Sequence, residues 1–283
     1  MTGLAVSTRA ELLRLRRWPA VWVMAGVWML LNITFVYVFA YLAYRNGGGF
    51  GNNGIPARTL LADVMPAAVP IAVVRGMPMF GGAIMLTLGA LAAGSGYGWG
   101  TWKTAFTQGP GRLAVIGGTI TGLAGVVAGV VAMTFAVDLG IASTLAAVEA
   151  QSIALPAAGD VTRALGGGVL ILSMWALAGL AIGTLARNPA LGVGLGVVWV
   201  LAVENLLRGA ATLLGWLKPI TDVLPGTAAG SIASALGAIP VSKGGTPGVV
   251  ANLHGAPSVA VTLGYLVTFT VVTGALVRRR EIG

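Results

Sequence analysis

The sequence predicts an all-α integral membrane protein with six transmembrane helices in a single transmembrane domain. Of its 283 residues, 57% are hydrophobic and only 9% are charged, and the mean hydropathy is +0.90. Soluble domains carry about 25% charged residues, so this composition indicates a chain that lies largely in lipid. Six segments are apolar over the roughly 20 residues that a helix needs to cross a hydrocarbon core. These segments are residues 19–44, 65–93, 113–137, 165–186, 189–207 and 259–277.

Residues 1–18 are expected to form a short interfacial helix on the cytoplasmic surface. Thr8 and Glu11 match the Thr-x-x-Glu pattern of a capping box, which predicts a helix start at Thr8. Leucines and arginines are mixed in the following turns, and arginine stems pack well along apolar surface. The alternative is a basic flank that only orients the first span. The first span is too long for the core of a secretory signal and a second span follows it, so we interpret it as a retained helix.

Proline and glycine shape the next spans. Pro66, Pro70 and Pro78 remove backbone donors and are expected to bend the outer half of the second span. The later spans carry small residues three or four positions apart, a pattern typical of close helix packing. These are Gly118, Gly122, Gly125 and Gly129, then Gly179 with Gly183, and Gly192 with Gly196. We expect them to pack within one subunit; a contact between two copies is the alternative.

Residues 208–258 are too many for a simple connector between the fifth and sixth spans. Within them, residues 220–239 are apolar but interrupted by Pro225, Gly226 and Gly230. This stretch is too broken to span a membrane alone, which predicts one or two short re-entrant or interfacial helices on the outer face.

The basic residues predict the orientation of the chain. Ten lie on one side of the membrane: Arg9, Arg14, Arg16, Arg17, Lys103, Arg112, Arg187, Arg278, Arg279 and Arg280. Six lie on the other side, diluted by Asp138, Glu149, Asp160 and Asp222: Arg45, Arg58, Arg163, Arg208, Lys218 and Lys243. Cytoplasmic loops are richer in Lys and Arg, so both termini, including the tail 278–283, are expected in the cytoplasm. The net charge of +9 is thereby explained without nucleic acid.

The most informative motif is a polar island, residues 94–112, between the second and third spans. Thr101 is a suitable helix cap, and Gly109 followed by Pro110 ends a helix. Between them, Trp102 and Phe106 lie on one face and the polar residues on the other. A capped helix with an aromatic face at the membrane surface is suited to enter a groove on a partner protein. The alternative is that this face lies flat on lipid headgroups.

With these features in place, the whole chain resembles in layout the permease subunit of ABC-2 type ABC transporters. The most specific match is to the cytoplasmic coupling segment of that family, at Gly98-Trp99-Gly100-Thr101-Trp102-Lys103 and Gln108-Gly109-Pro110-Gly111-Arg112. The turn 186–190 resembles the basic turn between spans four and five of the family, Leu224-Pro225-Gly226 the start of its outer re-entrant segment, and 278–281 its basic tail. The family's acidic residue before the tyrosine is replaced by Gly96, so any role of that carboxylate is absent here or is supplied by the partner.

The resemblance implies that a coupling helix docks on a separate ATPase subunit that binds ATP and Mg²⁺. In the family's usual assembly this subunit is present in two copies. The residues implied in coupling are Gly100, Thr101, Trp102, Lys103, Ala105, Phe106, Gln108 and Arg112. The chain has no Gly-x-x-x-x-Gly-Lys-Ser/Thr phosphate loop, so we expect no cofactor or ATPase site in this chain. Two permease chains, identical or similar, would face each other around the transport path. They would lie in the plasma membrane, which in a cell with two membranes is the inner one.

Charged residues near the membrane interior are the other candidates for function. Arg75 lies inside the second predicted span, where an arginine costs about 2.5–3.5 kcal/mol on insertion scales. We hypothesise that Arg75 meets Asp63 or Glu204 and shapes the outer part of a translocation path. The alternatives are that Arg75 extends to the outer surface, or that Glu204 only pairs with Arg208.

The residue inventory argues against several other functions. The chain has no cysteine, and His254 is its single histidine, so thiolate chemistry is excluded and histidine-based metal sites or triads gain no support. The scarcity of ionisable groups in the spans disfavours a membrane-embedded enzyme. The sequence therefore favours an exporter of apolar or amphipathic molecules such as drugs, antibiotics or lipids. A membrane sensor or assembly scaffold that binds a cytoplasmic protein is the alternative.

Overall fold

The computed structural model describes residues 3–47, 56–98, 100, 104 and 111–279, and these residues form helices and connecting segments without any β-strand. Six helices in the described part are long and apolar enough to cross a membrane, which confirms the predicted all-helical class and indicates a multi-pass membrane protein. Their bounds are Pro19–Arg45, Met77–Gly98, Arg112–Val148, Ala158–Ala186, Pro189–Leu213 and Gly255–Arg279.

Several of these helices are built from consecutive pieces. The first joins α2 (Pro19–Asn32) to α3 (Phe39–Arg45) through a π-helical turn, and the fifth joins α10 (Pro189–Val198) to α11 (Glu204–Leu213) in the same way. The others are α6 (Gly82–Gly98), α8 (Arg112–Val148), α9 (Ala158–Ala186) and α14 (Gly255–Arg279). Shorter helices are α1 (Gly3–Arg17), α4 (Ala57–Ala62), α5 (Val69–Arg75), α12 (Lys218–Asp222) and α13 (Pro225–Ala235).

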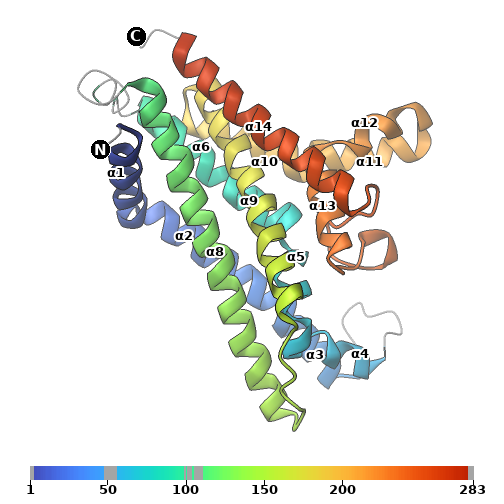
Figure 1. Ribbon diagram of the computed structural model, residues 1–283. Helices are drawn as coiled ribbons and strands as arrows, with labels where there is room; N and C mark the ends of the chain where they lie inside the picture. The colour runs from blue at the N-terminus through green and yellow to red at the C-terminus, as the bar shows by residue number, and fades with distance from the viewer. Residues whose placement is uncertain (1–2, 48–55, 99, 101–103, 105–110, 280–283) are drawn as a thin grey trace.

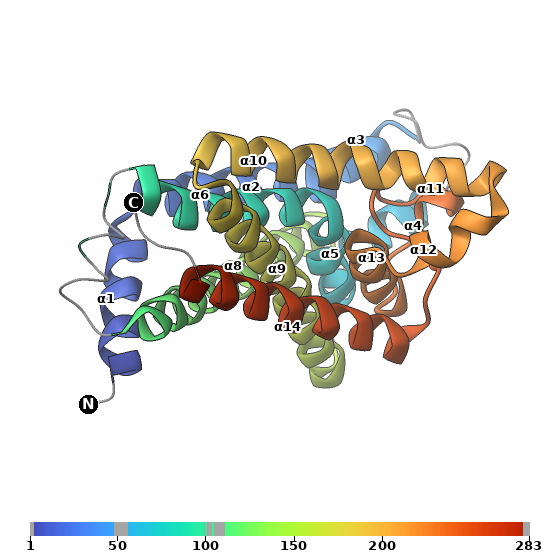
Figure 2. The same ribbon diagram turned by 90° about the horizontal axis from the view of Figure 1, so that it is seen from above.

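Helix α9 lies in the middle of the bundle, between α6 and α14 (Figure 2). Its backbone approaches α6 so closely that only glycine fits at the crossing. A Cβ on Gly179 would lie 1.9 Å from the carbonyl oxygen of Leu86, and one on Gly89 would lie 2.0 Å from that of Ala176. Gly183 and Gly192 face each other at the next contact. The predicted small-residue pairs of the fourth and fifth spans therefore pack within the subunit.

The glycine row of α8 holds α1 rather than another long helix. Gly118 lies against Ser7, Gly122 against Glu11, and Gly125 against Leu12, whereas Gly129 faces open space. This packing extends α1 back to Gly3, so the predicted helix start at Thr8 is wrong. Glu11 does not close a capping box; it pairs with Arg14 one turn later.

The second span differs from the predicted continuous segment 65–93. A turn at Gly76 separates α5 from a π-helical turn, Met77–Gly81, in which the Gly81 N–H donates to the carbonyl of Gly76. Pro78 has no N–H for a regular helical bond, which explains the break at this point. The indole of Trp175 donates to the carbonyl of Pro78 at 3.0 Å and holds the break against α9. The helix then continues to Gly98, beyond the predicted end.

The third span is also longer than predicted. Helix α8 does not end at Val137; it runs to Val148, so Asp138 lies inside the helix and not in an outer loop. Asp138 is fully buried, and Asn32 of α2 donates a hydrogen bond to it at 2.6 Å. Its helical neighbour Leu139 packs against the core. A charged residue that forms a hydrogen bond inside the protein can therefore lie within a membrane-spanning helix.

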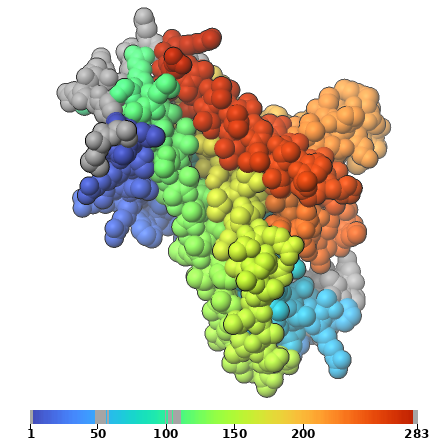
Figure 3. Space-filling view, viewed as in Figure 1, coloured from blue at the N-terminus to red at the C-terminus, as the bar shows by residue number. Residues whose placement is uncertain are grey.

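Arg14, Arg16 and Arg17 lie in the last turn of α1, and Arg278 and Arg279 in the last turn of α14; we call the end of the molecule that holds them the basic end. The described ends of the chain, in α1 and α14, both lie at this end (Figure 1). Arg112 at the start of α8 donates to the carbonyl of Val277 near the end of α14 at 3.5 Å. At the opposite end, α11 and α12 stand away from the bundle as the orange lobe in Figure 3. Beside them, α13 is buried from Pro225 to Ala233.

Candidate functional site

Most of the polar island lies outside the described residues. This holds for Thr101, Trp102, Lys103, Ala105, Phe106 and Gln108, whose predicted helical contact face is therefore untested. Of the remaining positions, Gly100 has a positive φ of +68°, which favours glycine, and Thr104 is exposed. The island connects the ends of two fixed helices, α6 and α8, at the basic end of the molecule.

The turn between α9 and α10 contacts the end of α6, from which the island begins. The guanidinium carbon of Arg187 lies 5.9 Å from the ring centre of Tyr97 at the end of α6, a cation–π contact. Arg187 adopts a left-handed conformation, and the Asn188 side chain then accepts hydrogen bonds from the N–H groups of Ala190 and Leu191, which caps α10. The short turn between α9 and α10 thus braces the helix that leads into the island.

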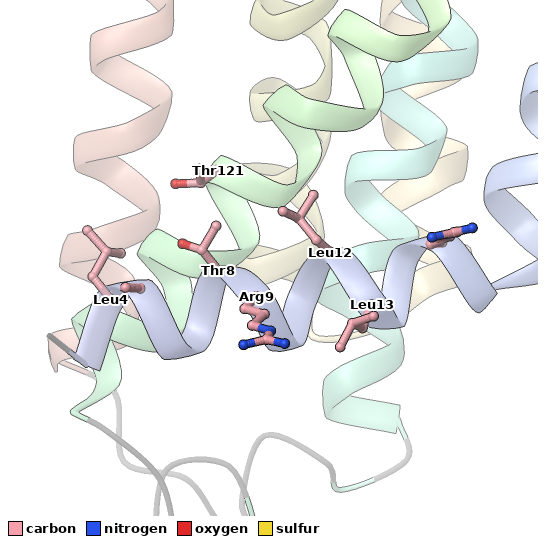
Figure 4. Close-up of a pocket in the computed structure, with 8 residues that line it drawn as sticks. Leu4, Thr8, Arg9, Leu12, Leu13 and Thr121 are labelled. Atoms are coloured by element: carbon pink, nitrogen blue, oxygen red, sulfur yellow. The ribbon is translucent and has the colours of Figure 1, made fainter. Parts of the chain in front are cut away.

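An open groove runs beside α1 at the same end. It encloses about 610 Å³ and is lined by seven residues of α1 and by Thr121 of α8. Figure 4 shows Leu4, Thr8 and Leu12 along the side of α1 next to Thr121, with Arg9 and Leu13 turned away from it. Leu12 and Leu13 are both substantially exposed, so α1 presents apolar and basic side chains together.

A second cavity, of about 430 Å³, lies at the opposite end among α2, α3, α5 and the segment 237–247. Arg75 and Asp63 both line it, together with Asn32 and aromatic side chains. Arg75 donates to the carbonyl of Val36 at 3.4 Å. The structure thus brings two of the three predicted charged residues into one cavity, although no ion pair within 4.0 Å joins them in the described part of the chain.

Glu204 lies elsewhere. It is 1% exposed, and its Oε1 accepts a hydrogen bond from the backbone N–H of Gly226 at 2.8 Å, at the first turn of α13. Its neighbour Arg208 donates to Asn205 at 2.7 Å and to Thr227 at 3.4 Å. A carboxylate at a helix N-terminus is favourably placed, so Glu204 fixes α13 against α11 and is not part of the cavity that contains Arg75.

Behind the cavity lies a buried polar cluster that sequence reasoning missed. Asn32 bonds Asp138, the Trp28 indole donates to Thr134 at 2.9 Å, and the Tyr37 hydroxyl donates to the Asp138 carbonyl at 3.3 Å. These residues link α2 and its π-helical turn to α8. The sequence did contain a signal for this cluster, because Asn32 and Asp138 both interrupt apolar stretches. Asn32 lies inside the first predicted span, and Asp138 follows the third predicted span with no turn-forming residue next to it.

Two carboxyl groups outside the spans have shifted pKa values. Burial raises the pKa of Asp63 above its ordinary value, and the positive charge of the nearby Arg75 opposes this shift only in part. Hydrogen bonds from Tyr41 and Tyr44, at 2.7 and 3.0 Å, lower the pKa of Glu149, which also pairs with Arg45 at 3.5 Å. Glu149 therefore remains ionised and holds α3 against the end of α8.

Comparison of the sequence with models of known protein families finds no match, and comparison with curated proteins of known function also finds none. The functional conclusion consequently rests on the residues and geometry described above.

Proposed function

We propose that this protein is the permease subunit of an ABC transporter of the ABC-2 type, which exports an apolar or amphipathic molecule. The observation that carries the proposal is the polar island itself, a capped aromatic sequence between α6 and α8. The contacts of Tyr97 with Arg187 and of Arg112 with Val277 brace its two ends. A helix on such supports would transmit force from a partner to α6 and α8, which pack against α9 and α1.

In this proposal, the island docks on an ATPase subunit that binds ATP and Mg²⁺, and two permease chains with two ATPase copies make up the transporter. The basic end of the molecule is cytoplasmic, in keeping with the positive-inside rule. Helix α1, with its leucines and arginines, lies on the cytoplasmic surface of the plasma membrane. The short buried helix α13 forms the re-entrant element on the outer side, held by Glu204.

The test co-expresses the full chain with a candidate phosphate-loop ATPase subunit of the same organism and measures ATP turnover of the purified assembly in lipid. Trp102→Ala and Phe106→Ala are each expected to lower turnover stimulated by the permease by about tenfold, because aromatic anchors dominate protein interfaces. The control is Trp216→Ala, at an exposed tryptophan near α12 at the opposite end, which is expected to leave turnover unchanged.

Two outcomes would contradict the proposal: an ATPase whose turnover is the same with and without this chain, or stimulation that survives both island substitutions. Co-purification with a cytoplasmic protein that hydrolyses no ATP would favour the scaffold alternative.

A further inference from the structure

The cavity beside Arg75 carries charged groups that the chain itself leaves without full partners. The Arg75 Nε is buried and has no hydrogen-bond partner within the described residues. The hydrogen bond from its Nη2 to the Val36 carbonyl, its single one in the described part of the chain, is long at 3.4 Å. A guanidinium offers five N–H donors, and a buried donor without an acceptor is unfavourable. The arrangement therefore favours an acceptor group, above all an anionic one, inside the cavity.

Asp63 supplies the opposite charge in the same cavity. Among the residues that the structure describes, no hydrogen bond or ion pair engages its carboxylate. Arg75 is near enough to influence Asp63 electrostatically without contacting it. A cation and an anion that share one cavity and do not pair leave room for a ligand with both charges between them.

Two other titratable groups lie near Arg75, and one oxygen of Asp138 has no hydrogen-bond partner among the described residues. Asp138 does not line the cavity, and its carboxylate accepts from Asn32. The Tyr37 hydroxyl donates to a backbone carbonyl. Among the described residues that line the cavity, Arg75 and Asp63 are the charged side chains that a ligand would meet.

An aromatic wall completes the cavity. The Phe35 ring packs edge-on against Phe39, with centroids 5.2 Å apart, and nearly parallel to Phe80, with centroids 6.3 Å apart. Phe35 is 59% exposed and Phe39 is 43% exposed, so the wall continues from the cavity onto the exposed face of the π-helical turn and of α3. Aromatic faces attract ammonium groups, and their area accommodates an alkyl chain.

We propose that this cavity binds a zwitterionic amphiphile, with its anionic group at Arg75, its ammonium group at Asp63 and its apolar chain along Phe35 and Phe39. The volume of about 430 Å³ suits a headgroup and the first part of a chain. The inference goes beyond the proposed transport function, because binding at this site requires no ATPase.

The test measures the binding of three probes that carry the same fluorescent acyl or alkyl chain, by anisotropy, to the purified full chain in detergent. The probes are lysophosphatidylethanolamine (zwitterionic), lysophosphatidylglycerol (anionic) and a primary alkylamine (cationic). The wild-type chain is expected to bind the ethanolamine probe at least about tenfold more tightly than the other two, since each of those lacks one charge contact.

Two substitutions are expected to change this preference in opposite directions. Asp63→Asn removes the ammonium partner and equalises the ethanolamine and glycerol probes. Arg75→Gln removes the anion partner and makes the alkylamine the tightest of the three. Asp222→Asn is the control, because Asp222 bonds Asn252 away from the cavity, and it is expected to retain the wild-type order. A general loss of fold cannot produce opposite shifts.

Equal affinities of the wild-type chain for the three probes would overturn the inference. So would a preference that neither cavity substitution alters, or loss of all binding in both variants. Because no ATPase is present, these results are independent of the coupling test for the proposed function.

Discussion

At the scale of single residues, buried polar side chains tie α2 to α8. Asp138 is fully buried, and Asn32 is its side-chain donor at 2.6 Å. The second carboxylate oxygen of Asp138 has no partner in the described part of the chain. The pair therefore ties α2 to α8 by one short bond, and loss of the donor would leave a buried carboxylate without any side-chain hydrogen bond.

Asn32→Leu is expected to lower the stability of the folded protein by about 1–3 kcal/mol, the cost of an unsatisfied buried polar group. Replacement of both partners, Asn32→Leu with Asp138→Leu, is expected to recover most of this loss because no polar group is left unpaired. Thermal unfolding of the purified protein in one detergent measures both effects. A double variant that is less stable than the single variant would show that the contact does not act as a pair.

At the scale of the elements, helix periodicity and glycine spacing predicted the bundle well, whereas helix ends were predicted poorly. The pairs Gly179 with Gly183 and Gly192 with Gly196 were readable because backbone contact demands small side chains at helical spacing. The end of α8 was not readable, because Asp138 resembles a loop residue until Asn32 is known to face it. The start of α1 was missed for a similar reason, since packing on Gly118 outweighs the local capping signal of Thr8.

Gly179→Ala is expected to destabilise the protein by about 1–3 kcal/mol or more, because its Cβ would collide with the Leu86 carbonyl and force α6 and α9 apart. The matched control is Gly166→Ala in the same helix, where the added Cβ meets no atom within 4 Å, so that no loss is expected. Thermal unfolding again provides the comparison. Equal melting temperatures for the two variants would refute the close crossing of α6 and α9.

At the scale of the whole molecule, composition predicted the all-helical membrane class, whereas the orientation predicted from the basic residues stays a prediction. The candidate site was only partly predictable. Arg75 and Asp63 were identified as charges near a membrane span, and the structure brings them into one cavity. The placement of Glu204 at the N-terminus of α13 depends on a contact across 22 residues, which spacing along a single helix does not reveal.

The orientation of the molecule in the membrane has a direct test, because the chain has no native cysteine. Lys243→Cys, at the end opposite α1, is expected to react with a membrane-impermeant maleimide. The reagent is added to cells whose plasma membrane is intact and whose outer layers have been removed so that it reaches that membrane. Thr104→Cys, at the basic end, is expected to react only after permeabilisation. The opposite pattern would invert the proposed topology.

The central claim is that the island between α6 and α8 binds an ATPase subunit. A photo-crosslinking amino acid placed at position 102 in the full chain tests this claim directly when the candidate ATPase subunit is co-expressed and the crosslinked products are identified by mass spectrometry. Our account predicts crosslinks from position 102 to the ATPase, and none from the same probe at position 216. Crosslinks from position 102 to lipid or to this chain alone would contradict it.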